Sequence, residues 1–147
     1  ITTSIGGNVL LGCLTGGSLT DGFGNICIKG NISTSGYYNI VLGDDANCGD
    51  SSYNIVLGVG TGNLSFTGAS NILVGNSSGA ALTSGDHCLF IGSGAGQSIT
   101  TGNNTLILGA YSGTSNLTNN IILSNPSSGA IQAQFDGSIW TLVQQVI

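Results

Sequence analysis

The chain has 147 residues and very few charges: charged residues make up 5% of it, namely six aspartates and one lysine, Lys29. Nucleic acids and anionic membrane surfaces are bound through clustered Lys and Arg, so this composition argues against both as partners. It does not indicate disorder, because 40% of the residues are hydrophobic and they recur at regular intervals. No apolar run has the length of a membrane span and no signal peptide opens the chain. We therefore expect a piece of a longer protein whose targeting information lies elsewhere.

One five-residue unit recurs eight times: an apolar triplet, usually preceded by Asn and followed by Gly. The copies are 8–12 NVLLG, 25–29 NICIK, 39–43 NIVLG, 54–58 NIVLG, 71–75 NILVG, 88–92 CLFIG, 105–109 TLILG and 120–124 NIILS. Successive copies lie 17, 14, 15, 17, 17, 17 and 15 residues apart. This period is too short for two helices and suits one coil of a β-solenoid. The sequence predicts an all-β parallel solenoid (β-roll or β-helix) of about eight coils over residues 1–124, with a capping segment over 125–147.

Each triplet predicts a strand with apolar side chains on both faces. Successive side chains point to opposite faces, so positions two and four of the unit face one way and position three the other. Position three holds Leu10, Cys27, Val41, Val56, Leu73, Phe90, Ile107 and Ile122. A single solenoid buries only its interior face, which leaves an apolar stripe roughly 40 Å long in water. We expect another surface to cover it, and the pattern does not say which face is the inner one.

Three further positions of the coil have an expected structural role. Between the units, one apolar residue alternates with hydroxyl residues, as in 65–68 SFTG and 98–102 SITTG, which predicts a half-buried second strand. The recurring Gly suits a corner with positive φ or close backbone packing. The leading Asn is expected to stack its amide on the Asn of the next coil.

The last part of the chain differs from the repeats. Pro126 interrupts the pattern, and two alternating runs, 130–135 and 138–143, flank the turn signal Asp136-Gly137. These runs predict a β-hairpin cap over the last coil, with Trp140 in the apolar face of the cap.

The four cysteines, Cys13, Cys27, Cys48 and Cys88, occupy different positions within the repeat. A disulfide ladder would need cysteines in register, so we expect buried free thiols. Free thiols favour folding in a reducing compartment over export through an oxidising one.

Two stretches carry a resemblance to known families. Residues 38–58, YNIVLGDDANCGDSSYNIVLG, resemble the head repeat of trimeric autotransporter adhesins, and residues 94–109, GAGQSITTGNNTLILG, are similar to repeats in tail-fibre and spike proteins of phages and large DNA viruses. Both families imply left-handed parallel β-rolls or β-helices assembled as homotrimers, with the apolar strand against the three-fold axis. The bulky position-three residues Leu73, Phe90 and Ile107 depart from the small residue frequent there in the family, and they leave open which face lines the axis.

We assign no catalytic, cofactor-binding or metal-ligating residue. Asp44, Asp45 and Asp50 are the only carboxylates clustered in one coil, and we interpret them as solvated loop acids rather than a glycosidase pair or a cation site. His87 has no nearby Ser-His-Asp arrangement and is expected at a coil edge.

The predicted function is a non-catalytic structural or receptor-facing segment of a trimeric fibre or spike on a virion surface. Its partners would be two further copies of the chain and a host-surface receptor or glycan. An alternative is a bacterial trimeric adhesin head on the cell surface that binds host matrix or glycan. Less favoured are an ice-binding solenoid, suggested by the threonines, and a polysaccharide-degrading tailspike, which would need Asp44 to Asp50 to be catalytic.

Overall fold

The computed structural model describes residues 6–12, 19–32, 35–125, 129–135 and 140–144, and in these ranges the ordered elements are all β-strands. The strands are β1 (Val9–Leu11), β2 (Ile26–Ile28), β3 (Ile40–Leu42), β4 (Ile55–Leu57), β5 (Ile72–Val74), β6 (Leu89–Ile91), β7 (Leu106–Leu108), β8 (Asn120–Asn125), β9 (Gly129–Phe135) and β10 (Trp140–Gln144). Each of the first seven strands coincides with one apolar triplet, because the flanking Asn and Gly positions turn the chain.

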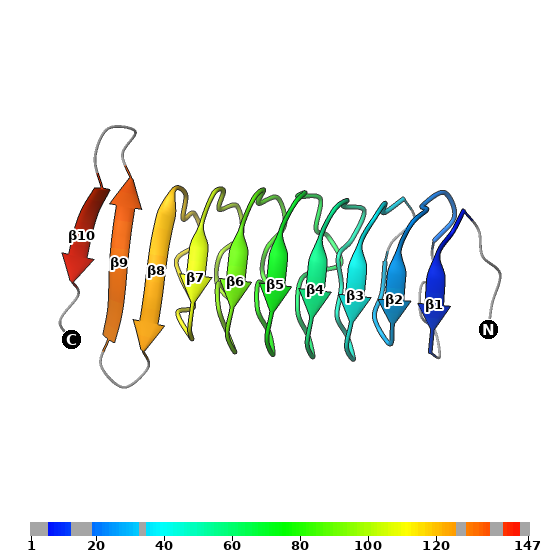
Figure 1. Cartoon of the computed structure of the whole chain (residues 1–147), viewed down its shortest axis with the longest axis horizontal. Helices are drawn as coiled ribbons and strands as arrows, with labels where there is room; N and C mark the ends of the chain where they lie inside the picture. The colour runs from blue at the N-terminus through cyan, green and yellow to red at the C-terminus, as the bar shows by residue number, and fades with distance from the viewer. Residues whose placement is uncertain (1–5, 13–18, 33–34, 126–128, 136–139, 145–147) are drawn as a thin grey trace.

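The strands form one sheet in the order of the sequence, from β1 to β10 (Figure 1). β1 to β8 pair in parallel and in register, so that position three always lies beside position three, as in Val41 beside Val56 and Val56 beside Leu73. The result is a β-solenoid of eight parallel strands and about six turns. The predicted fold class is confirmed, and all eight apolar units lie in parallel strands, but the turns number about six rather than the predicted eight.

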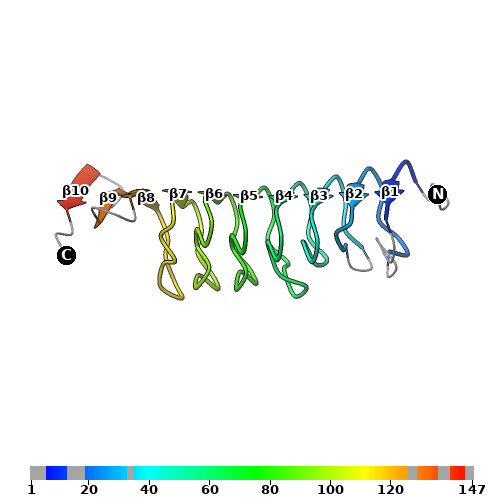
Figure 2. The ribbon, with the colours of Figure 1, turned by 90° about the horizontal axis from the view of Figure 1, so that it is seen from below.

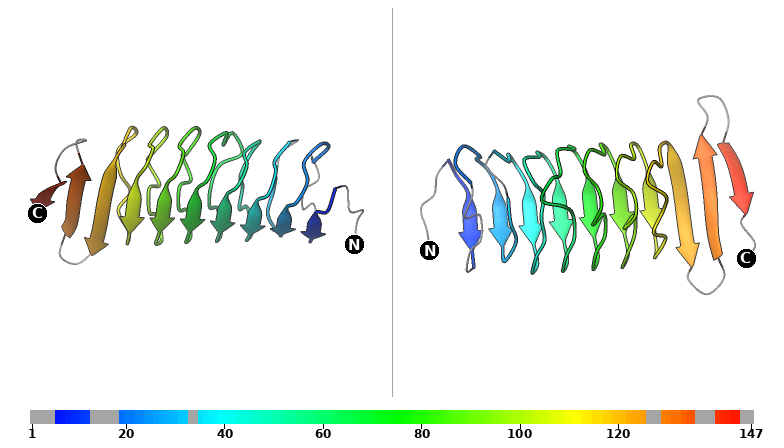
Figure 3. Two further views of the ribbon diagram at one scale, coloured as in Figure 1. Left: turned by 45° about the horizontal axis from the view of Figure 1, so that its top comes forward. Right: turned by 180° about the vertical axis from the view of Figure 1, so that it is seen from behind.

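The solenoid is a flat rod with the sheet on one side and the return loops on the other (Figure 2). Seen from the side of the sheet, the chain runs down each strand, returns upward behind it and advances from β1 toward β8 at the left (Figure 1). This path is a left-handed coil, the opposite of the hand usual for crossovers between parallel strands. The views from above and from behind show the same arrangement (Figure 3).

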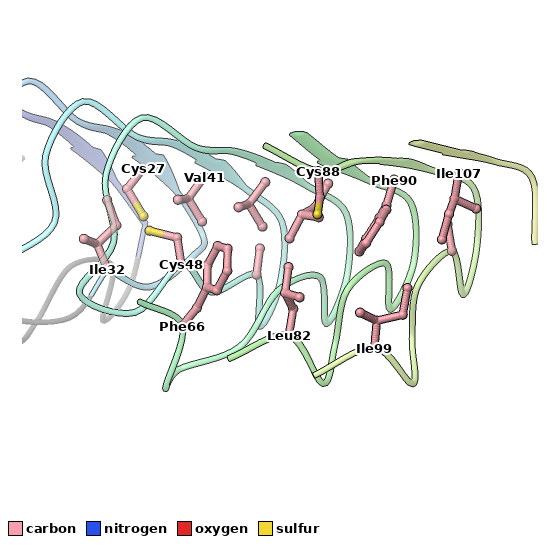
Figure 4. Close-up of a cluster of buried hydrophobic side chains, with 14 of the residues drawn as sticks. Cys27, Ile32, Val41, Cys48, Phe66, Leu82, Cys88, Phe90, Ile99 and Ile107 are labelled. Atoms are coloured by element: carbon pink, nitrogen blue, oxygen red, sulfur yellow. The ribbon is translucent and has the colours of Figure 1, made fainter. Parts of the chain in front are cut away.

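The core lies between the sheet and the loops, and position three of each unit points into it (Figure 4). The position-three side chains from β2 to β8 are fully buried: Cys27, Val41, Val56, Leu73, Phe90, Ile107 and Ile122. One apolar residue of each loop packs against them from the opposite side, including Ile32, Phe66, Leu82 and Ile99. Each turn therefore closes its own small core, and position three is the inner face.

The hydroxyl-rich half of the coil is not a strand, contrary to the prediction. Its residues form turns and bends, although its apolar residue is buried and Thr67 is exposed, as the alternation indicated. The loops stack through backbone hydrogen bonds between neighbouring coils, such as Thr67 N to Thr83 O at 2.8 Å and Thr83 N to Thr100 O at 2.9 Å. The glycines in this half pack backbone on backbone: a Cβ on Gly68 would lie 1.9 Å from Gly85 O, so only Gly fits there.

The leading asparagines form a buried ladder along one edge of the sheet, as predicted. In each rung the Asn Oδ1 accepts the backbone N–H of the next ladder residue, for example Asn39 N to Asn25 Oδ1 at 2.8 Å and Asn54 N to Asn39 Oδ1 at 2.9 Å. The Asn Nδ2 donates to a carbonyl of the following loop, as in Asn71 Nδ2 to Gly85 O at 2.8 Å. The ladder residues are Asn8, Asn25, Asn39, Asn54, Asn71, Cys88, Thr105 and Asn120.

The glycines at the opposite end of the strands need both a positive φ and close packing. Gly43 has φ 139°, and a Cβ on it would lie 2.3 Å from the carbonyl oxygen of Gly58. Lys29 takes the equivalent place in the second unit by adopting φ 57° instead. Ser124 ends the last unit inside β8, where the strand continues to Asn125 rather than turning.

After β8 the chain forms the predicted hairpin. β9 pairs antiparallel with β8, and β10 pairs antiparallel with β9, with Trp140 beside Phe135. Both strands continue the plane of the sheet (Figure 2). Pro126 and the turn residues Asp136 and Gly137 lie outside the described residues, as does the side chain of Trp140. Coverage of the coil end by this hairpin therefore stays a prediction.

Candidate functional site

The most unusual surface of the described structure is the outer face of the sheet. Positions two and four of every five-residue unit point away from the core, and all of them are Val, Ile or Leu. Their exposure is 55% at Val9 and 53% at Leu11, falls to intermediate values at the middle strands, and is 46% at Leu123. We call this surface the outer apolar face. Its members are Val9, Leu11, Ile26, Ile28, Ile40, Leu42, Ile55, Leu57, Ile72, Val74, Leu89, Ile91, Leu106, Leu108, Ile121 and Leu123.

The outer apolar face is large for one chain in water. Eight strands at the usual spacing and three residues per strand give an area of about 400 Å². That is comparable to the largest apolar patch of an ordinary monomer, and here it is uninterrupted by any polar side chain from β1 to β8. A contiguous patch of this kind marks a surface that binds another one.

The aspartates of the third coil lie at the surface, as predicted. Asp44 and Asp45 border a concavity of about 300 Å³, whereas Asp50 accepts a hydrogen bond from Ser35 N at 3.1 Å. The concavity is lined by Lys29, Gly30, Asn31, Asp44, Asp45, Asn47 and Leu64. Asp50 is not among the residues that line this concavity. In the described ranges, no three His, Cys, Asp or Glu residues form a group suited to holding a metal ion.

His87 is exposed at the coil edge that precedes β6, in the left-handed backbone region with φ 57°. Its neighbour Cys88 is buried in the asparagine ladder and donates its thiol to Gly102 O at 3.2 Å. The two side chains therefore belong to different environments and do not act as a ligand pair.

Three cysteines are buried free thiols, namely Cys27, Cys48 and Cys88, as predicted, and Cys13 lies outside the described residues. Burial raises the pKa of Cys27 and Cys88 to about 11 and that of Cys48 to about 12. Since the thiolate is the reactive form, these cysteines are unreactive at neutral pH while the chain is folded.

We expect a maleimide reagent at pH 7 to leave Cys27, Cys48 and Cys88 unmodified in the folded protein and to modify them in guanidinium chloride. Intact mass spectrometry before and after unfolding counts the added groups. A disulfide among these cysteines, or rapid labelling in the native state, would contradict the assignment of buried thiols.

Sequence reasoning missed an aromatic cluster at the same edge as His87. Tyr38 and Tyr53 stack with ring centroids 5.3 Å apart and planes 14° apart, and Phe23 packs edge-on against Tyr37 and Tyr38. The signal was present in the sequence, because a tyrosine precedes the ladder Asn in two consecutive coils.

No protein family model, curated protein or solved structure matches this chain. Within the described ranges, no helix has the length and hydropathy to cross a membrane.

Proposed function

We propose that this chain is a non-catalytic segment of a homotrimeric fibre or spike. It would act as a stiff rod, bury the outer apolar face at the trimer axis and present its loops and coil edges to a receptor. The observation that carries the proposal is the outer apolar face, which runs along the whole parallel sheet. Three copies related by a three-fold axis would each turn the same face inward, so one pattern of residues would cover all three sheets. The number three rests on the resemblance to trimeric adhesin and fibre repeats.

The register of the strands supports a rod that can be assembled along its full length. Every rung presents two outward aliphatic residues at the same two positions, so contacts of the same kind can form at each rung. The rungs are joined by backbone hydrogen bonds, the asparagine ladder and the closely packed glycines, and this connectivity gives the rod stiffness. Sedimentation or light scattering of the purified segment should give the mass of three chains. A stable monomer at micromolar concentration would overturn the proposal.

We place the fibre on a virion surface. The buried free thiols support this choice, since a protein that folds in cytosol keeps its cysteines reduced. The alternative is a bacterial trimeric adhesin head, and the left-handed coil is compatible with both. A coiled-coil stalk and membrane-anchor barrel in the rest of the reading frame would favour the adhesin, and a virion-anchoring segment the fibre.

The ice-binding alternative loses support from the threonine hydroxyls. Thr83 Oγ1 donates to Thr100 O at 2.9 Å, and Thr100 Oγ1 donates to Ser115 O at 2.7 Å. These hydroxyls serve the stacking of the loops rather than an ordered water layer.

For the tailspike alternative, we expect no turnover of polysaccharides by the purified segment, because Asp50 does not line the concavity that Asp44 and Asp45 border. Reducing-end assays on a panel of bacterial capsular and cell-wall polysaccharides measure it. Turnover that disappears in Asp44→Asn or Asp50→Asn would establish a catalytic role instead.

A further inference from the structure

A row of residues with left-handed backbone conformation runs along the rod just before the asparagine ladder. Its members are Gly7 (φ 76°), Gly24 (71°), Tyr38 (54°), Tyr53 (60°), Ser70 (60°), His87 (57°), Asn104 (51°) and Asn119 (59°). Because the backbone repeats from rung to rung, the Cα–Cβ bonds of this row point the same way. The side chains therefore stand side by side, one rung apart, on the edge of the rod.

The aromatic members of the row cover one another in a defined order. The Tyr38 ring lies over Gly24, where an added Cβ would come within 2.7 Å of it, and the Tyr53 ring stacks on Tyr38. One face of Tyr53 is thus occupied. The next rung holds Ser70, whose small side chain cannot cover the other face, and Tyr53 is 61% exposed.

The rung of Ser70 is a notch between larger neighbours. Both of its edge residues, Ala69 and Ser70, are small, while the next rung presents Asp86 and His87. Rungs lie about 4.8 Å apart, so the rungs of Tyr53 and His87 are about 9.6 Å apart. A ring placed at the level of Ser70 would lie one rung from Tyr53, close to the 5.3 Å at which Tyr38 stacks on Tyr53.

Asp86 gives the notch a fixed polar group. Its Oδ1 accepts the Ala69 N–H at 2.7 Å, and its own N–H donates to Asn103 Oδ1 at 2.8 Å. The half-buried carboxylate is therefore held beside the Ala69–Ser70 rung, where it can accept a hydrogen bond from a ligand hydroxyl. The hydroxyl of Ser70 and the imidazole of His87 add further groups that hydrogen-bond.

We propose that this notch binds one hexopyranose ring of a neutral glycan, with the ring stacked on the open face of Tyr53 and its hydroxyls bonded by Asp86 and His87. The C–H bonds on the apolar face of a sugar carry partial positive charge, which the face of an aromatic ring attracts. Sialic and uronic acids are disfavoured, because Asp86 lies in the notch and the chain carries a net charge of −5. The inference deepens the receptor-facing role proposed above and rests on it.

The test uses the methyl glycosides of glucose, galactose and mannose with the assembled protein, observed by saturation-transfer NMR. We expect transfer to the ring C–H protons of at least one of them. Ser70→Tyr should abolish it, since a tyrosine at this position would continue the stack of Tyr38 and Tyr53 and fill the notch. Tyr53→Ala should weaken binding at least about tenfold, and Tyr53→Phe should retain it. Leu64→Ala, exposed on the loops, is the matched control and should bind like the parent.

Two outcomes would overturn the glycan proposal without contradicting the trimeric assembly of the parent protein. One is absence of transfer to all three glycosides, or transfer that persists in Ser70→Tyr. The other is a change in assembled mass in Ser70→Tyr, which would assign the notch to a contact between protomers. Light scattering on the same samples tests the trimeric assembly of the parent protein, and NMR tests glycoside binding at the notch. The two proposals can therefore fail independently, because a monomeric parent protein can still be tested for binding.

Discussion

Ile55→Asp should abolish the assembly of three chains. Ile55 lies in β4 at the middle of the outer apolar face, and the three-fold axis would bring three copies of the new carboxylate together in a surface without cations. Unpaired charges removed from water cost several kcal/mol each, which exceeds what one rung of apolar contact contributes. Size-exclusion chromatography with light scattering should replace the peak of three chains by single chains or aggregate.

Two matched variants define what the effect means. Leu64→Asp introduces the same charge at a leucine that is 56% exposed on the loop side, and the assembled mass should be unchanged. Val56→Asp places the charge one residue along the strand but inside the coil, where Val56 is fully buried, and the β-sheet circular dichroism itself should be lost. Should Ile55→Asp keep the mass and stability of the parent, the outer apolar face would not be the trimer interface.

The sequence predicted the coil closely because one short unit carries most of the folding information. The apolar triplet determines the strand, the Asn before it determines the ladder, and the Gly after it determines the corner. Since the units repeat in phase, the register of all parallel pairs follows from the repeat alone. If a strand pair were shifted by one residue relative to the repeat, Val41 and Val56 would no longer lie side by side, and inward and outward residues would be paired.

Three features were not predictable from the pattern. The triplet is apolar on both faces, so only the three-dimensional path of the chain shows that Val56 points inward and Ile55 outward. The loop half alternates like a strand, yet its residues form turns and bends whose glycines pack backbone on backbone. The hand of the coil depends on how the corners turn in space, which hydrophobic periodicity does not encode.

The candidate sites show the same limit. The sequence correctly placed Asp44, Asp45 and His87 at the surface, because burying a charged or polar side chain without a partner costs free energy. It did not reveal the notch at Ser70, which arises from the absence of a large side chain between Tyr53 and His87. Such a gap is visible only once residues 17 positions apart are known to lie side by side, as the hydrogen bond from Ala69 N to Asp86 shows.

The asparagine ladder should be the least tolerant part of the fold after the glycines. Asn54 is buried, its Oδ1 accepts from Asn71 N at 2.9 Å, and its Nδ2 donates to Gly68 O at 3.1 Å. Asn54→Leu keeps a similar size but leaves that N–H and that carbonyl without these partners. An unsatisfied buried group costs about 1–3 kcal/mol, so we expect a loss of about 2–6 kcal/mol per chain.

This loss should lower the thermal midpoint by about 10 °C or more, measured by circular dichroism at one fixed chain concentration, since assembly makes the midpoint depend on concentration.

Cys88→Asn is the matched control in the same row. Cys88 already occupies a ladder position: its thiol donates to Gly102 O at 3.2 Å, and its sulfur is hydrogen-bonded to the Thr105 backbone. Because sulfur is a weak donor and a weak acceptor, an Asn there would make both bonds with stronger groups. Its midpoint should be at least as high as that of the parent. If Asn54→Leu unfolds at the same temperature as the parent, the ladder contributes no net stability, and the stacking of the coils would then rest on the apolar core and the backbone hydrogen bonds alone.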